Sequence, residues 1–242
     1  MRKSELKPRK IPIQQRSQAM VELILKAATR VLARESLAGF NTNRVADVAG
    51  ISVGSLYQYF PNKAALVTEL IARAHAEFSD ALRQLAQQVD GQPLEDVLHA
   101  VARLAIAQQY ANPVFAAALD HEEKRLPIQD QLQAFGAHML ALVSSLLARH
   151  AAELAPDLPS AAAADCMAIT KALVEADAEQ ALKPAPDLED RIVRALQGYL
   201  TVSTPARRRD GTHRRPAAMR TTSVRQPLGK RGWFPRPGVA GG

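Results

Sequence analysis

The sequence predicts an all-α fold in which a small N-terminal unit of three helices precedes a larger helical domain. Three observations favour it. Apolar residues recur at helical spacing from Ser17 onward, a glycine-containing turn separates two very short helical segments, and long later segments carry almost no charge. At 242 residues the chain is long enough for one good core or two small domains.

The first helix is expected from about Ser17 to Gly39. Met20, Ile24 and Val31 begin an apolar stripe at the spacing of one helix face. The preceding residues 1–16 hold six basic residues and two prolines, with little periodic apolar pattern. We expect them to form a flexible basic arm.

Two very short helices should follow. Asn41 or Thr42 can cap the first, which runs through Val48, and Gly50 can close it in the left-handed conformation. Ser52 is placed to cap the second, which runs through Phe60.

Pro61 discourages continuation of that helix, and Asn62 can cap a longer one from Lys63 to about Gln88. Two short helices joined by a tight turn and backed by a long helix make a helix-turn-helix. Its small core is predicted to contain Val45, Val48, Ile51, Leu56 and Phe60. The side chains predicted to face outward are Ser55, Tyr57, Gln58 and Tyr59, where hydroxyl groups can reach phosphates and rings can reach sugars or thymine methyl groups.

Charge is distributed unevenly along the chain. Residues 1–75 carry a net charge of +7, residues 76–200 carry −9, and residues 201–242 carry +9. Basic ends around an acidic middle suggest that the N-terminal part meets a polyanion, while the middle has another task.

The stretch TNRVADVAGISVGSLYQYFPNKAAL, residues 42–66, resembles the DNA-binding helix-turn-helix of the TetR family of bacterial transcriptional regulators, which we call the reading head. The resemblance covers Gln18 to about Arg73. It implies that the positions contacting phosphates are Thr42, Ser52, Tyr57, Tyr59 and Lys63. It also implies that the positions at or beside base edges are Asn43, Val53, Gly54, Ser55 and Gln58. Arg44 completes the DNA-binding set.

Two positions depart from the family pattern. Val53 stands where lysine is frequent, so one phosphate contact is either missing or replaced by apolar contact with a thymine methyl group. Ala64 stands where an acidic residue is common at the start of the next helix. Neither change threatens the fold, but the operator sequence cannot be borrowed from a relative.

The middle of the chain contains helices with few charges, as buried helices do. The resemblance implies that they line a cavity for a small-molecule ligand. Candidate lining residues, for which ordinary core packing is the alternative, are Gln108, Gln109, Tyr110, Phe115, Phe135, His138 and Met139.

The last helices are expected at Ser160 to Leu182 and at Asp187 to about Leu200, separated by the segment KPAP. The resemblance places two such helices in a four-helix bundle of a homodimer, although packing within one chain would cover their apolar faces equally well. The predicted interface residues are Leu173, Val174, Leu182, Leu188, Ile192, Leu196 and Tyr199.

These predictions divide the chain into a basic arm at 1–16, a DNA-binding domain at 17–75, a ligand-binding and dimerisation domain at 76–200 and a basic tail at 201–242. The tail is rich in arginine, proline and glycine, so we expect disorder. It serves either as a sequence-independent DNA arm or as a solvated tail.

Other functions find little support in the sequence. The single cysteine, Cys166, gives no disulfide or thiolate metal site, and no catalytic motif, metal site or cofactor loop is recognisable. No secretory signal or membrane-spanning segment is expected, which favours a cytoplasmic protein. The sequence predicts a homodimeric repressor that a small molecule releases from a palindromic operator in double-stranded DNA. A non-specific architectural DNA-binding protein is the alternative.

Overall fold

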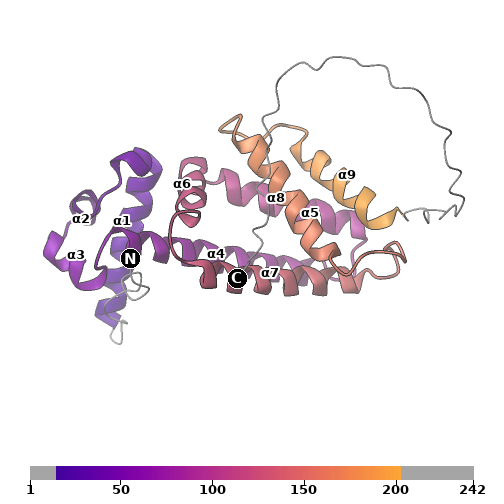
Figure 1. Ribbon diagram of the computed structural model, residues 1–242, viewed down its shortest axis with the longest axis horizontal. Coiled ribbons are helices and arrows are strands. Elements are labelled where there is room, and N and C mark those ends of the chain that lie inside the picture. The colour runs from indigo at the N-terminus through magenta and orange to yellow at the C-terminus, as the bar shows by residue number, and fades with distance from the viewer. Residues whose placement is uncertain (1–14, 203–242) are drawn as a thin grey trace, which may run out of the picture. The chain divides into compact units, whose positions relative to one another are not determined.

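The computed structural model describes residues 15–202, and these residues form helices only (Figure 1). Residues 1–14 of the predicted arm and residues 203–242 of the predicted tail lie outside this range. The helices are α1 Gln15–Gly39, α2 Thr42–Ala49, α3 Val53–Tyr59, α4 Lys63–Gln88, α5 Leu94–Tyr110, α6 Pro113–Glu123, α7 Gln129–Arg149, α8 Ala162–Ala178 and α9 Leu188–Thr201. The predicted all-α class is confirmed.

The first core joins α1, α2, α3 and the first half of α4. Residues spaced three or four apart on α1, such as Ile24, Ala28 and Val31, are at most 1% exposed. Leu56 of α3 and Leu66 of α4 complete the centre of this core at 0% exposure. Burying one aliphatic side chain of this size contributes about 1.5–3 kcal/mol, so the short α2 and α3 are stabilised mainly by packing.

The α6 helix and the turn after it extend this first core. Ala118 and Leu119 of α6, together with Leu126 and Ile128, are buried in the same cluster as the α1 stripe. One helix of the predicted ligand-binding region, α6, therefore packs directly on α1 and α4.

An ion pair also ties α1 to α4. Arg73 donates from its two terminal nitrogens to the carboxylate oxygens of Glu22, at 2.7 and 2.6 Å. This bidentate hydrogen bonding lowers the pKa of Glu22. The fork geometry fixes the crossing of the two helices, although the partial exposure of both side chains keeps its contribution to stability small.

One residue near the end of α1 has an unusual backbone. Ser36 has φ 55° and ψ −171°, and it is the one non-glycine residue with positive φ within 15–202. L-residues enter positive φ at an energetic cost, so the kink stores backbone strain.

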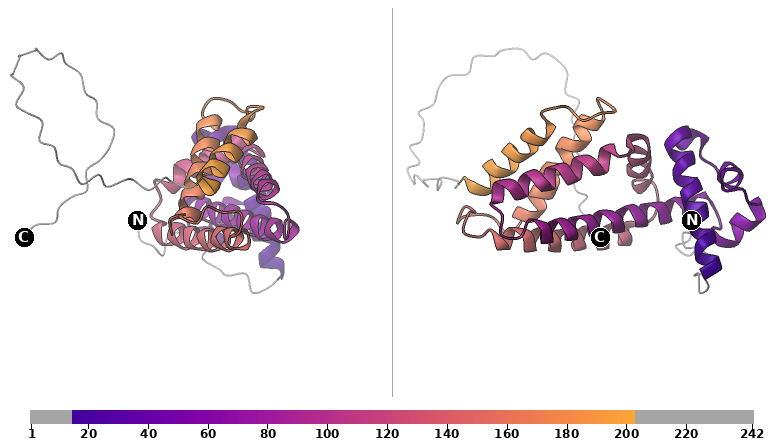
Figure 2. Two further views of the ribbon diagram at one scale, coloured as in Figure 1. Left: turned by 90° about the vertical axis from the view of Figure 1, so that its right-hand side faces the viewer. Right: turned by 180° about the vertical axis from the view of Figure 1, so that it is seen from behind.

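A second core joins α5, α8 and α9 (Figure 2). One face of α9 carries Leu188, Ile192 and Leu196, which are at most 2% exposed. They pack with Leu98 and Ala102 of α5. The backbone N–H of Ala155 donates to the carbonyl of Leu200 at 2.8 Å, which fastens the end of α9 to the loop after α7.

The long helix α4 runs from the first core to the turn before α5, and α7 lies along it (Figure 1). Arg149 at the end of α7 donates to the carbonyl of Ala86 at 2.9 Å and to Asp90 at 3.0 Å. Within residues 15–202, α7 is the one helix that is long and apolar enough, by length and composition only, to cross a membrane. It packs on α4 and α8 as a helix of the bundle.

The predicted helix from Ser160 to Leu182 is shorter in the structure, where α8 ends at Ala178. Asp177 is 7% exposed and accepts hydrogen bonds from the hydroxyl of Tyr110 and from the backbone N–H of Ala185. These partners draw the chain away from the helix axis after Asp177, so Leu182 lies beyond the helix and is 72% exposed.

Candidate nucleic-acid interface

The turn between α2 and α3 is fixed by local hydrogen bonds. The side chain of Asn41 accepts from the backbone N–H of Arg44 at 2.9 Å, which caps α2. At its other end Gly50 takes φ 68° and ψ 33°, the left-handed conformation that glycine adopts without steric cost. Ser52 then caps α3 by accepting from the N–H of Ser55 at 3.0 Å.

The orientation of α3 follows from its two anchors. Leu56 and the adjoining Phe60 are both 0% exposed and lie in the first core. The opposite side of α3 faces solvent, where Gly54, Tyr57 and Gln58 are exposed. The second helix of the motif is therefore held by its apolar side and offers its polar side outward.

A hydrogen bond joins α2 to α3 at the edge of this surface. Thr42 is 8% exposed, and its Oγ1 lies 3.0 Å from the hydroxyl of Tyr57. Tyr57 is 39% exposed, so its ring edge remains accessible while the hydroxyl is held in place. Two of the four predicted phosphate-contacting hydroxyl groups, those of Thr42 and Tyr57, lie side by side as a result.

Two cations flank this surface, and each is held by a neighbour. Arg44 Nε donates to Glu35 at 2.7 Å, and this hydrogen bond raises the pKa of the guanidinium group. Lys63 Nζ lies 3.5 Å from the carbonyl of Leu37 and 5.3 Å from the centre of the Phe40 ring. Both side chains are positioned before any ligand arrives.

The structure differs from the predicted exposure at several positions. Ser55, Tyr59 and Val53 are half-buried, and Val53 and Tyr59 pack against the first core. Val48 was expected inside but is 37% exposed, while Val45 and Ala46 of the same helix are 0% exposed in the first core. Of the four side chains expected to face outward, Tyr57 and Gln58 do so fully.

The remaining predicted DNA-binding residues are at least partly accessible. Asn43, Arg44 and Ser52 are exposed, and Lys63 is half-buried at the start of α4. The surface offers hydroxyl groups, one amide from α3 and two cations, which are the groups that proteins use for phosphates, sugars and base edges.

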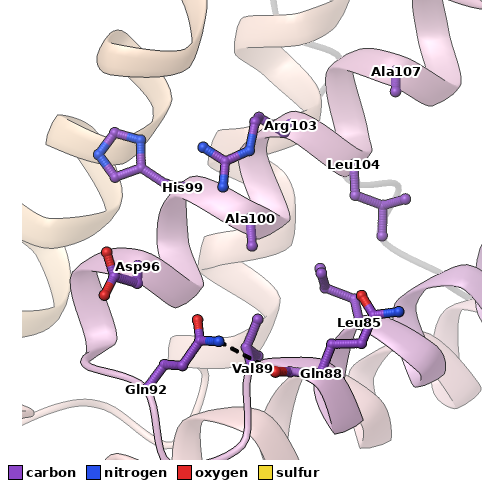
Figure 3. Close-up of a pocket in the computed structure, with 10 residues that line it drawn as sticks. All are labelled: Leu85, Gln88, Val89, Gln92, Asp96, His99, Ala100, Arg103, Leu104 and Ala107. Carbon is purple, nitrogen blue, oxygen red and sulfur yellow. Dashed lines mark hydrogen bonds between the residues drawn. The ribbon is translucent and has the colours of Figure 1, made fainter.

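A groove of about 780 Å³ lies between the end of α4 and the outer side of α5 (Figure 3). Its apolar floor includes Leu85, Val89 and Leu104. On the rim, the side-chain amide of Gln92 donates to the backbone carbonyl of Gln88 at 3.2 Å. The other lining residues are Asp96, His99, Ala100, Arg103 and Ala107.

Two basic side chains of this groove are tied to α9. His99 Nδ1 lies 2.7 Å from Glu189, and Arg103 donates to the same carboxylate oxygen at 2.8 Å. The groove therefore combines an apolar floor with a polar rim on which Glu189 holds His99 and Arg103.

The seven residues predicted to line a ligand cavity lie elsewhere. Phe135 stacks on His75 with ring centres 3.8 Å apart, and Met139 is buried with its sulfur 3.6 Å from the hydroxyl of Ser79. Tyr110 donates to Asp177 at 2.6 Å, and burial raises its pKa to about 12. Phe115 packs on the first core, and His138 Nε2 lies 3.2 Å from a terminal nitrogen of Arg83. Gln109 is half-buried and Gln108 is exposed. Their contact with a ligand stays a prediction.

The residues predicted for a dimer interface are mostly covered within the chain. Leu188, Ile192 and Leu196 pack in the second core, and Val174 is 6% exposed in the same cluster. The half-buried Leu173 and Tyr199 also pack on this core, and Tyr199 donates to Asp165. Intramolecular packing, the alternative left open by the sequence, accounts for this apolar face.

Comparisons with known proteins agree with this arrangement. The sequence pattern of the bacterial regulatory proteins of the TetR family matches residues 24–70, and the pattern of the tetracyclin repressor-like C-terminal domain matches residues 93–200. No curated protein matches the chain.

Solved structures share the fold at low sequence identity. A TetR-family transcriptional regulator from Haemophilus influenzae is 18% identical with a TM-score of 0.59, over 78% of this chain and 100% of its own. The fatty acid degradation regulator FadR from Bacillus halodurans is 20% identical with a TM-score of 0.58, over 78% of this chain and 96% of its own. A protein with unknown function from Rhodococcus is 17% identical with a TM-score of 0.61, over 80% of this chain and 100% of its own.

The two sequence patterns span both cores that the structure describes, and the first covers the caps, the turn and the outward face of α3. The chain therefore belongs to the TetR family of bacterial transcriptional regulators.

Proposed function

We propose that this protein is a cytoplasmic, homodimeric repressor that binds a palindromic operator in double-stranded DNA and leaves it when a small molecule binds. The observation that carries the proposal is the geometry of α3. Leu56 and Phe60 fix the helix from inside, while Gly54, Tyr57 and Gln58 remain exposed on its other side. A helix held in this way is suited to the major groove of DNA.

The outer surface of α8 supports the dimer. Ala164, Ala168 and Ala172 are exposed at helical spacing, and Gly198 of α9 has open space around the position of a Cβ atom. Small residues let the helices of a second copy approach closely, since the distance between helix axes depends on the side chains at the contact. Two copies related by a twofold axis would present two α3 helices to half-sites about 34–36 Å apart.

The groove beside α5 supports ligand control. Its volume and its apolar floor with a polar rim suit an amphipathic small molecule. Leu85 and Gln88 of the floor and rim belong to α4, the helix whose first half packs with the reading head. A ligand that binds one position of α4 better than another would change the separation of the two reading heads.

The test is the selection of bound sequences from a pool of random DNA duplexes at physiological salt. It uses the full chain and a chain that ends at Leu200. A single inverted repeat recovered by both proteins is the expected result, because α3 and the dimer helices are present in each. Binding to the repeat should weaken steeply as salt increases, since cations on the protein displace counterions from phosphates.

Other outcomes would favour the alternative, a non-specific architectural DNA-binding protein, or contradict the homodimer. If no repeat emerges and binding disappears with residues 201–242, the basic tail is the DNA-binding element and the protein is architectural. A motif without twofold symmetry would contradict the homodimer.

A further inference from the structure

We infer that Gln58 reads an adenine in each operator half-site through a pair of hydrogen bonds, which makes it the residue that determines base preference at that position. The inference rests on the proposed function, because it requires α3 to enter the major groove. It adds the identity of the base and of the side chain that recognises it.

Gln58 occupies the side of α3 that points away from the protein. Leu56, on the opposite side, is 0% exposed, and a helix rotates by about 100° per residue, so Gln58 lies about 200° around the helix from it. Gly54 is one turn earlier on the same side. Gln58 is therefore the one side chain larger than hydrogen on this outermost strip of α3, and it is exposed.

The neighbouring glycine leaves room for this side chain to lie flat against a base pair. Side chains of a helix lean toward its N-terminus, so Gln58 extends over the turn that contains Gly54. A Cβ atom at Gly54 would meet only the Ser52 hydroxyl oxygen, at 3.8 Å, which shows that the surface there is open. The absence of a side chain at this position lets the helix backbone approach the floor of the groove.

No arginine or lysine of α3 competes with Gln58 for recognition of a base. The helix sequence VGSLYQY contains no arginine or lysine, the residues that recognise guanine. The two predicted DNA-binding cations are Arg44, whose Nε donates to Glu35, and Lys63, whose Nζ lies 3.5 Å from the carbonyl of Leu37. Base recognition from α3 therefore depends on a neutral amide.

The chemistry of that amide favours adenine. A glutamine side chain offers an N–H donor and a carbonyl acceptor in one plane, which match the N7 acceptor and the N6 donor of adenine. Thymine and guanine each present only acceptors to a polar side chain in the major groove, and cytosine presents only a donor. Tyr57 offers a single hydroxyl, which already shares a hydrogen bond with Thr42, so it cannot match the paired donor and acceptor of adenine as an amide does.

Asn41 and Asn43 are also exposed amides of the motif, but Asn41 caps α2 with its side chain and Asn43 lies in the first turn of α2. The first helix of a helix-turn-helix crosses the DNA backbone, while the second enters the groove. Asn43 is therefore assigned to a phosphate or sugar.

The test repeats the selection from random duplexes with the full chain and three variants. Gln58→Ala removes the amide, Gln58→Glu replaces its donor by an acceptor in nearly the same shape, and Gln87→Ala is the control. Gln87 is an exposed glutamine in the last turns of α4, so it has the same chemistry outside the reading head.

The wild-type chain and Gln87→Ala should select one inverted repeat with an adenine at a fixed position of each half-site. Gln58→Ala should retain the rest of the repeat and lose the preference at that position, with affinity for the wild-type repeat reduced about 5- to 150-fold per half-site. Gln58→Glu should shift the preference at that position toward cytosine, whose N4 group donates.

If Gln58→Ala selects the wild-type repeat with all its base preferences intact, the inference is wrong while the proposed function stands. The inference would also be wrong if the preference that Gln58→Ala loses were for guanine and not for adenine. If the wild-type chain selects no repeat, the proposed function fails and the inference fails with it. Circular dichroism of each variant shows whether the helices are retained.

Discussion

Replacing Gly54 with alanine separates folding from DNA binding more cleanly than other changes in the reading head. Gly54 is the second residue of α3 and lacks the positive φ that would require glycine. The added methyl group would lie 3.8 Å from the Ser52 hydroxyl oxygen, which is an ordinary van der Waals contact. The folded chain therefore has room for the methyl group.

The expected effects on stability and binding have opposite signs. Alanine in a helix is favoured over glycine by about 0.5–1 kcal/mol, so Gly54→Ala should raise the free energy of unfolding by up to that amount. A change of 1 kcal/mol corresponds to about 2–4 °C in Tm for a chain of this size. The same methyl group stands on the outermost strip of α3, where it would hold the helix away from the bases.

The cost in DNA binding follows from the contact that is lost. One good base contact contributes about 1–3 kcal/mol, so operator affinity should fall about 5- to 150-fold per half-site. Thermal unfolding followed by circular dichroism measures the first effect, and titration of a labelled operator at fixed salt measures the second. Gly136→Ala in α7, where a Cβ atom also meets open space, is the control for a helix glycine outside the reading head.

Two results would refute this reasoning. Unchanged operator affinity would mean that the backbone of α3 does not approach the DNA closely at Gly54. A lower Tm would mean that glycine is needed there for folding, which contradicts the open space around the Cβ position.

Three further changes test other parts of the structure. Ser36→Gly should stabilise the chain by about 1 kcal/mol because glycine adopts φ 55° without strain, and an unchanged or lower Tm would contradict the strained kink. Tyr57→Phe removes the hydrogen bond to Thr42 and should cost about 0.5–1.5 kcal/mol in thermal unfolding, together with a loss of operator affinity; unchanged affinity would show that this hydroxyl does not contact a phosphate. Burial raises the pKa of Asp120, so its charged form destabilises the fold as pH rises through that pKa. Asp120→Asn should therefore raise Tm at pH 7, and the gain should vanish below the unfolded pKa of about 3.9; an equal gain at both pH values would rule out titration of Asp120 as the cause.

The reading head could be predicted in detail because its signals are local. Asn41, Ser52 and Asn62 each cap the helix that follows, and their side chains accept from backbone N–H groups three residues later. Gly50 ends α2 in the left-handed conformation, as its position in the sequence predicts. The predicted bounds of α4, Lys63 to about Gln88, agree with the structure for the same reason.

Features that depend on distant residues were not predictable in the same way. The groove brings Leu85 and Gln88 of α4 beside Ala100 and Leu104 of α5, and no motif marks those positions in the sequence. The kink at Ser36 also has no sequence signal, because serine gives no preference for positive φ.

The sequence by itself determined the all-α class, the three-helix reading head and the polar face of α3. These depend on capping residues, on one turn glycine and on apolar spacing, all of which act within a few residues. The tertiary structure alone decided which apolar faces are covered. Leu188, Ile192 and Leu196 pack in one cluster with Leu98 of α5, because burial of an apolar face has no direction and any complementary surface will satisfy it.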